Sequence, residues 1–307
     1  MRRRHLLAAT FTLACLGGFL TAAPAAAKFH RQQKLDLAPG GELLVEAAGG
    51  SVTVTGGAAD GGTVVITSTR DDIEDRYSFE VTSEPGRARV ISRRRGGWSQ
   101  GFGWNSSGNL HFDVRVPRAT RVDLKSSGGG IRVSGLKGNA RVRSSGGGLR
   151  IADIAGDIDA SSSGGGVEVK QVSGDVRVSS SGGGVDVTQV NGNVDASSSG
   201  GGVHVDGVGG KVTADSSGGS VSAVLAEGNA AGGSLSSSGG GVRVAIARDT
   251  RLSIDAYSSG GSVSCELPVE RSGKQTRTTL RGDLNGGGSV LKLRSSGGGI
   301  RIDASGG

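Results

Sequence analysis

The feature that most constrains this chain is a short motif, Ser-Ser-Gly-Gly followed by Gly or Ser, which returns at a fixed interval. It begins at Ser126, Ser144, Ser162, Ser180, Ser198 and Ser216, every 18 residues, and again at Ser237, Ser258 and Ser295. A fixed period of this length is typical of proteins that stack one structural unit on the next. The chain is therefore expected to form a stack of coils.

Each period carries the same pattern of apolar residues, counted from the first Ser of the motif. The sixth, eighth, eleventh, fifteenth and seventeenth positions are aliphatic or Ala, as in Ile131, Val133, Leu136, Ala140 and Val142. Apolar residues at alternate positions are typical of a strand with one face toward a core. The thirteenth position is Gly, usually followed by Asn or Asp, which is typical of a sharp corner with unusual backbone angles. Each period is therefore predicted to hold two or three short strands.

One coil is too small to fold alone. About five buried aliphatic side chains stabilise it by on the order of 10 kcal/mol, whereas ordering its backbone costs about 18 to 36 kcal/mol. Stacked coils add hydrogen bonds between strands and bury each apolar column against the next. The sixteenth positions, Arg141, Asp159, Arg177 and Asp195, alternate in charge, which favours parallel, in-register stacking. The sequence predicts an all-β fold, a single-stranded parallel β-helix or β-solenoid with coils of about 18 residues and irregular N-terminal coils.

The repeat also predicts how the chain is divided. Residues 122–307 hold the regular coils of 18 to 21 residues, and residues 28–121 form an irregular β region that continues into them. Within that region, residues 93–108 form an insertion without the pattern, and the strand-like stretches are 63–69, 77–82, 87–92 and 110–116. The last coil begins at Ile300 and is cut short at Gly307, so an open strand edge is expected there. An open edge supports one functional alternative, a scaffold that assembles from copies of itself.

The first 27 residues have the order of a secretory signal peptide. Arginines at positions 2–4 precede an apolar run over residues 6–20 and small residues that end at Ala27, after which cleavage is expected. The apolar run is shorter than the ~20 residues that span a bilayer, so a membrane-spanning protein is not expected. A lipoprotein signal at residues 12–15 and a twin-arginine signal at residues 3–7 are the two alternatives. These readings predict export to the periplasm or the cell surface of a bacterium.

Charge and cysteine content narrow the possible partners and cross-links. Cleavage after Ala27 removes three arginines, so the formal net charge falls from +7 to +4. This mildly basic charge is not in itself typical of a protein that binds polyanions. The mature chain keeps one cysteine, Cys265, so no internal disulfide is possible. Cys265 occupies the eighth position of its coil, where other coils have Val or Ile, and is predicted to be a buried structural thiol.

The start of the regular coils resembles a known family. The segments 114–118 and 122–124 are followed by residues 126–138, with the sequence SSGGGIRVSGLKG. This order resembles the bacterial putative-adhesin β-strand-repeat family, a domain of unknown function, over residues 30–305. The Gly and Ser content here is heavier than the pattern of that family. The resemblance implies an extracytoplasmic β-helical domain with a role in adhesion, and it implies no catalytic residues.

The candidate binding residues lie in the insertion, which contains both tryptophans of the chain. They are Arg93, Arg94, Arg95, Trp98, Phe102 and Trp104. Aromatic rings beside a cationic patch are suited to stacking on sugars and to binding anionic polysaccharide or lipid headgroups. The alternative is an insertion whose rings pack back on the solenoid. Nucleic acid is not expected as a partner, because the protein is exported and no other segment interleaves basic and aromatic residues.

The sequence gives little support to catalysis or to cofactors. The histidines of the mature chain are scattered without ligand spacing, so no metal site and no cofactor are predicted. A calcium-binding repeat is disfavoured because the position of Asp186 holds Arg, Glu or His in other coils. Only Glu168 and Asp186 resemble the paired acids of a polysaccharide lyase or hydrolase, the enzymatic alternative. We therefore predict a non-enzymatic envelope module, structural, adhesive or binding, whose partner is an envelope polysaccharide, another protein or a second copy.

Overall fold

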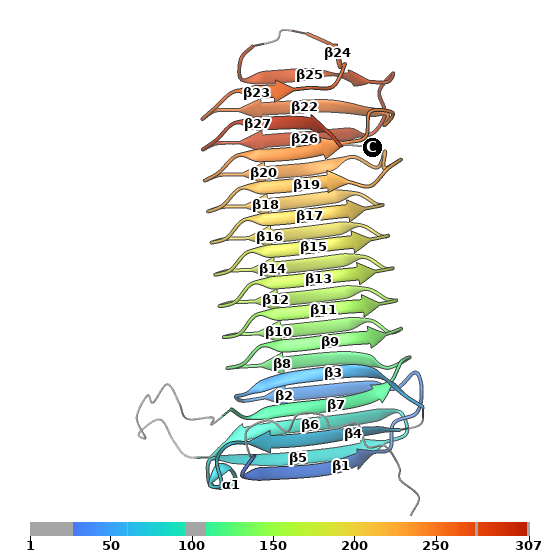
Figure 1. Ribbon diagram of the computed structural model, residues 1–307, viewed down its shortest axis with the longest axis vertical. Helices are drawn as coiled ribbons and strands as arrows, with labels where there is room; N and C mark the ends of the chain where they lie inside the picture. The colour runs from blue at the N-terminus through green and yellow to red at the C-terminus, as the bar shows by residue number, and fades with distance from the viewer. Residues whose placement is uncertain (1–26, 60, 96–108, 274–275, 306–307) are drawn as a thin grey trace, which may run out of the picture.

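The fold is taken from a computed structural model, which describes residues 27–59, 61–95, 109–273 and 276–305. Nearly all secondary structure in these ranges is β-strand, in two sheets of 13 and 14 strands, here named sheet A and sheet B. The sheets enclose one apolar core and run along a rod (Figure 1). The prediction of an all-β solenoid is confirmed.

Each regular coil contributes one strand to sheet B and the next strand to sheet A. The first coil holds β8 (Arg121–Ser126) and β9 (Ile131–Leu136). The following strands are β10 (Ala140–Ser144), β11 (Leu149–Ile154), β12 (Ile158–Ser162), β13 (Val167–Val172), β14 (Val176–Ser180), β15 (Val185–Val190), β16 (Val194–Ser198), β17 (Val203–Val208), β18 (Val212–Ser216), β19 (Val221–Leu225), β20 (Gly233–Ser237) and β21 (Val242–Ile246). Neighbouring strands are parallel, and residues 18 positions apart pair directly, as Arg150 does with Glu168. Equivalent residues of successive coils therefore form continuous rows.

The core is built from the predicted apolar positions. In one coil, Leu149, Ile151 and Ile154 are each at most 2% exposed. The first Ser of each motif is buried beside them, and its hydroxyl is hydrogen-bonded twice. Ser162 Oγ donates to the Gly147 carbonyl oxygen of the preceding coil at 3.0 Å and accepts the Gly165 N–H at 3.0 Å. A buried hydroxyl is tolerated only with such partners, so these bonds explain the Ser column.

The glycines at the corners allow close approach and do not supply unusual angles. The residues with left-handed φ in the regular coils stand at the tenth position, with φ between 55° and 73°: Gly135, Asp153, Gln171, Gln189 and Gly207. The prediction of unusual angles at the Gly-Asn and Gly-Asp pairs is therefore wrong. A Cβ on Gly156 would lie 2.8 Å from the backbone carbonyl carbon of Gly138. Glycine is required there because neighbouring coils touch through bare backbone.

Chain order and spatial order differ at the N-terminal end of the rod. The coil of β2 (Glu42–Ala47) and β3 (Ser51–Ala58) lies between the coil of β8 and β9 and the strands β6 (Arg87–Arg94) and β7 (His111–Pro117). Outside these lie antiparallel strands and one short helix: β1 (Phe29–Leu35), β4 (Gly62–Ser68), α1 (Ile73–Arg76) and β5 (Tyr77–Glu84). The strand-like stretches predicted in this region are all strands. The repeat pattern did not predict β1.

The last coil of the chain is not the end of the rod. Its strands, β26 (Val290–Ser295) and β27 (Ile300–Ala304), insert between β20–β21 and the coil of β22 (Leu252–Ser258) and β23 (Val263–Cys265). Sheet B then closes with two antiparallel strands, β25 (Thr279–Leu284) and β24 (Glu270–Arg271) (Figure 1). The predicted open edge at the last coil is therefore wrong, because β27 is paired on both sides. The outermost strands at this end have only 3 and 2 residues.

Candidate binding surface on sheet B

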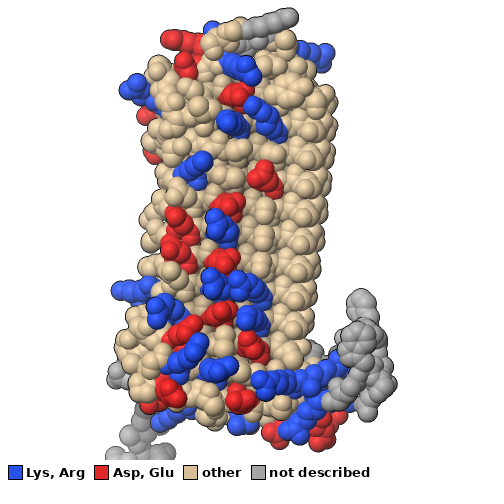
Figure 2. Space-filling view, turned by 180° about the vertical axis from the view of Figure 1, so that it is seen from behind, with Lys and Arg blue, Asp and Glu red and all other residues tan. Residues whose placement is uncertain are grey.

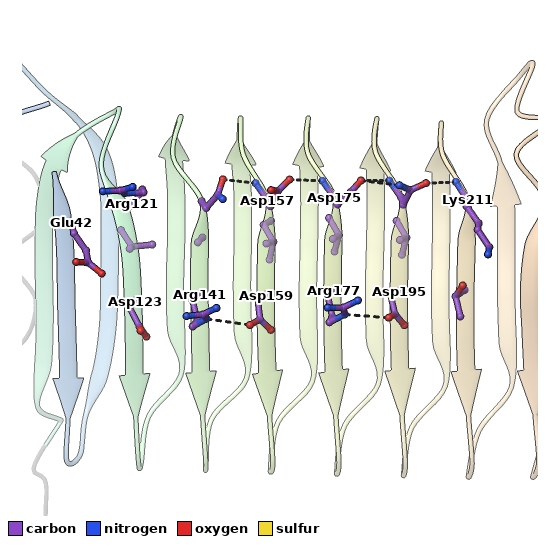
Figure 3. Close-up of a pocket in the computed structure, with 18 residues that line it drawn as sticks. Glu42, Arg121, Asp123, Arg141, Asp157, Asp159, Asp175, Arg177, Asp195 and Lys211 are labelled. Carbon is purple, nitrogen blue, oxygen red and sulfur yellow. Dashed lines mark hydrogen bonds and ion pairs between the residues drawn. The ribbon is translucent and has the colours of Figure 1, made fainter. Parts of the chain in front are cut away.

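The outer face of sheet B carries an open groove with a volume of about 770 Å³. It begins at Glu42 of β2 and continues over the starts of β8, β10, β12, β14, β16 and β18 (Figure 3). Two rows of polar side chains line it, one just before the strands and one near their first residues. The groove therefore crosses several coils, and each coil contributes one side chain to each row.

Asn and Asp side chains form the row at the corners, as a ladder of hydrogen bonds between coils. The Asp157 N–H donates to Asn139 Oδ1 at 3.0 Å, and the Asp175 N–H donates to Asp157 Oδ1 at 3.0 Å. The Asn193 N–H continues the ladder to Asp175 Oδ1 at 2.8 Å, and the Lys211 N–H bonds to Asn193 Oδ1 at 2.9 Å. Sequence reasoning placed these residues only at corners, although their recurrence in four coils was a signal for a continuous row.

Alternating charges form the second row. Arg141 Nε lies 3.3 Å from Asp159 Oδ2, and Arg177 Nε lies 3.3 Å from Asp195 Oδ2. The register inferred from these charges is confirmed. The pairs are open to solvent, with the Arg177 side chain 76% and the Asp195 side chain 50% exposed. Because exposed ion pairs contribute little to stability, these side chains can exchange their partners for a ligand at little cost to the fold.

The chemistry that the described surface offers is charge pairing and hydrogen bonding, by guanidinium, carboxylate and amide groups. On the face shown in Figure 2, basic and acidic side chains interleave along the rod, beside a flank free of charged side chains. No group of three or more His, Cys, Asp or Glu side chains within the described ranges is arranged to hold a metal ion. In the same ranges, no helix has the length and apolar character needed to cross a membrane.

A second, smaller groove lies on sheet A and includes the two acids considered for catalysis, Glu168 and Asp186. The Glu168 carboxylate accepts hydrogen bonds from Lys170 Nζ at 2.6 Å and from Arg150 Nε at 3.0 Å. These two contacts lower the pKa of Glu168. A carboxyl group that stays ionised is unsuited to protonating a glycosidic oxygen. These contacts therefore do not suit Glu168 to the role of the general acid in a lyase or hydrolase.

The predicted binding residues of the insertion fall partly within the described structure. Arg93 and Arg94 end β6, Arg95 follows it, and all three are exposed. Arg93 Nη1 lies 3.8 Å from Glu80 Oε2. Because β6 pairs with β2, these arginines belong to the same sheet as the groove. The aromatic members of the site lie outside the described residues, so their role stays a prediction: Trp98, Phe102 and Trp104.

Cys265 lies on β23, the outermost strand of sheet A, and is only partly buried. It is therefore less buried than predicted, because among the described residues no further strand covers that edge of the sheet. The side chain still packs against the core, and burial raises the pKa of the thiol. Ala27 is exposed just before β1, and cleavage after it stays a prediction.

The fold and its polar rows define a β-solenoid with a solvent-accessible polar groove on one face. The Toastrack DUF4097 family matches residues 42–303, so the chain belongs to this family. The resemblance that the sequence carries, to a β-repeat domain of unknown function, is confirmed. Among curated proteins, none matches the chain.

Several solved structures are similar to this chain at low identity. A putative adhesin from Bacteroides fragilis is 12% identical, with a TM-score of 0.43, over 90% of this chain and 98% of that chain. A putative adhesin from Parabacteroides merdae is 11% identical, with a TM-score of 0.45, over 89% and 95% of the two chains. A putative lipid binding protein from Parabacteroides distasonis is 12% identical, with a TM-score of 0.42, over 89% and 96%.

Proposed function

We propose that this protein is an exported, non-enzymatic binding module of the bacterial cell envelope, which holds an extended polymer along the outer face of sheet B. The observation that carries this proposal is the groove, which spans successive coils and is lined by two rows of polar side chains. A polymer is the fitting ligand because the contacts recur along the rod, with the charged row repeating every two coils. The signal peptide predicted for residues 1–27 supports export to the periplasm or the cell surface.

The charges in the groove narrow the chemistry of that polymer. Coils are spaced by ~4.8 Å, so the Arg and Asp alternation repeats about every 9.6 Å along the rod. Each repeat of two coils holds one positive and one negative side chain. These are Arg141 and Asp159 in one repeat, and Arg177 and Asp195 in the next. A polymer that carries carboxylate groups together with ammonium, amide or hydroxyl groups can pair with the charged side chains and hydrogen-bond to the Asn and Asp row. Envelope polysaccharides and the peptide-bearing glycan of the cell wall have these groups.

Binding at a row of weak contacts depends on rigidity and repetition. Each exposed contact is worth little alone, but a ligand held at one coil meets the next coil at high effective concentration. Strands that are hydrogen-bonded to both neighbours hold the rows in place, so little side-chain and backbone order is lost on binding. The arginines at the end of β6 lie on the same sheet but at the opposite ends of the strands from the groove, so they form a separate cationic cluster.

The test is titration of the mature chain with purified envelope polysaccharides and soluble cell-wall fragments. The double variant Arg141→Ser with Arg177→Ser removes both cations of the alternating row. The matched control, Arg132→Ser with Arg150→Ser, makes the same charge change on the outer face of sheet A. We expect the sheet B variant to bind about tenfold or more weakly, and the control to bind like the wild type.

Two results would contradict the proposal. If the wild type binds none of the envelope polymers, the proposed function is wrong. If both double variants lose affinity equally, the binding site is not the groove on sheet B. The same titrations, followed by chromatography of the polymer, check the absence of catalysis. Shortened or unsaturated products would show an enzyme, and loss of those products in Glu168→Ala with Asp186→Ala would place the active site on sheet A.

A further inference from the structure

The two ends of the rod differ in the strands that close them. At the C-terminal end, the outermost strands β23 and β24 have 3 and 2 residues. At the N-terminal end, the outermost strands β1 and β5 have 7 and 8 residues. Within the described part of the chain, no strand pairs with the outer edge of β1 or of β5. Long unpaired edges are sites where another strand adds to a sheet.

The core also reaches the surface at this end. Phe29 of β1 and Phe79 of β5 stack with ring centroids 5.7 Å apart, and Phe79 meets Phe112 edge-on at 6.1 Å. Phe112 is fully buried, whereas Phe29, Phe79 and Val81 are only partly buried against the core. An apolar patch between two unpaired edges has the layout of an interface, with an apolar centre and a polar rim.

The charges on the two edges are opposite in sign. β1 carries Arg31 and Lys34, and β5 carries Glu80 and Glu84. Glu80 has one long contact to Arg93, at 3.8 Å, and no ion pair to a described residue is found for Lys34 or Glu84. One edge of the end face is therefore basic and the other acidic, and a second copy of the same end is complementary to it.

Strand direction fixes how two copies fit together. β1 runs antiparallel to β4, which runs antiparallel to β7, and β5 runs antiparallel to β6. Because the strands of one coil run out in sheet B and back in sheet A, β1 and β5 share one direction. Their ends lie together, since the Asp36 N–H donates to Ser83 Oγ at 3.0 Å. A twofold axis along the strands therefore places β1 of one copy beside β5 of the other, with Lys34 near the partner position of Glu84.

We propose that the N-terminal end of the rod is a self-association surface, where two copies join end to end through β1 and β5 and double the length of the solenoid. This inference is independent of the polymer-binding function proposed above. The end face measures roughly 25 Å by 20 Å, from strand length and sheet spacing, and its burial in both copies removes about 1,000 Å² from solvent. That area is at the lower limit for a specific interface, so the dissociation constant is expected in the micromolar range.

The test is sedimentation of the mature chain from about 1 to 200 µM, a range that brackets a micromolar dissociation constant. Lys34→Glu and Glu84→Lys each place like charges at both contacts of the dimer, and both residues are exposed, so the fold is expected to persist. Each variant is expected to dimerise about tenfold or more weakly. An equimolar mixture of the two restores opposite charges at both contacts and is expected to recover wild-type association. Lys137→Glu and Glu227→Lys make the same charge changes at exposed positions outside the end face and serve as controls.

Three outcomes overturn the proposal. The first is a wild-type chain that stays monomeric throughout the concentration range. The second is a mixture that associates no better than its two components, which would show that β1 and β5 do not meet across the interface. The third is dimerisation of a variant that lacks residues 97–107 when the wild type stays monomeric. That result would identify the deleted segment, and not a second copy, as the occupant of the end face.

Discussion

Gly183 tests the idea that the glycine columns exist to let coils touch. A Cβ on this residue would overlap the backbone nitrogen of Gly166 in the preceding coil and lie 2.6 Å from its Cα. The φ angle of Gly183 is not left-handed. Steric overlap is therefore the reason for glycine here, and Gly183→Ala must push two coils apart locally.

The size of the effect follows from what the displaced coil loses. Overpacking of a tight contact costs about 1 to 3 kcal/mol. The carbonyl oxygen of Gly183 accepts Ser198 Oγ at 2.9 Å, and its N–H donates to Ser180 Oγ at 3.0 Å. Weakening these two hydrogen bonds adds about 1 kcal/mol each. We expect Gly183→Ala to lower the free energy of unfolding by about 3 to 5 kcal/mol.

The assay is chemical denaturation with hydrogen exchange, because a stack of repeats can open locally before it unfolds globally. Gly86→Ala is the matched control, since a Cβ there meets no atom within 4 Å. Gly183→Asn separates the two explanations: Asn tolerates left-handed angles, so it would be milder than Ala if angles mattered, and is at least as harmful if space matters. A loss for Gly183→Ala no larger than that for Gly86→Ala would refute the reasoning.

Three further predictions concern single side chains. Ser180→Ala removes both hydrogen bonds of a buried hydroxyl and should destabilise by about 1 to 3 kcal/mol, whereas exposed Ser181→Ala should be nearly neutral in the same denaturation assay. The pKa of Asp255 is lowered, chiefly by its hydrogen bond from Arg294, so its stabilisation is complete above the usual Asp pKa of about 3.8 and is lost as the pH falls through the lower folded value. Asp255→Asn should flatten the acid limb of the pH–stability curve, and an unchanged limb would contradict this. Burial raises the pKa of Cys265, so thiol labelling at pH about 8 should be slower than for an unfolded control, and equal rates would argue against it.

The rows of the regular coils were predictable because each is set by residues 18 positions apart. Alternating apolar residues such as Val167 and Val169 fix which face of the strand is buried, and a one-residue slip would expose them. The charges of Arg177 and Asp195 fix the same register from the outer face. Local pattern and stacking period agree, so the sequence determines the middle of the rod.

The candidate site was less predictable because its geometry depends on the spacing between coils. Nothing in the sequence shows that Asp157 accepts a backbone N–H from the next coil, or that its side chain lines a groove with Arg141 and Asp159. The pattern of Gly followed by Asn or Asp indicated a turn. The pattern did not show whether glycine is needed there for an unusual backbone angle or for close approach of the next coil. The aromatic insertion stood out by composition, which carries no information on where its side chains lie.

The ends could not be predicted from the period, because both are closed by strands that leave the order of the repeat. β2 precedes β8 by 79 residues, and the pair is joined by Lys125 Nζ at 3.0 Å from Glu46 Oε1. β27 lies inside the stack, while residues that precede it in the chain cover the C-terminal end. Antiparallel strands end both sheets at the N-terminal end and sheet B at the C-terminal end, so the repeat cannot simply be extended by another copy of itself. At the C-terminal end this leaves edges too short to pair, whereas at the N-terminal end it leaves two long edges of opposite charge. The C-terminal end therefore offers no long edge to a second copy, whereas the N-terminal end is suited to one symmetric contact. Such an arrangement permits a dimer but not a fibre of many copies.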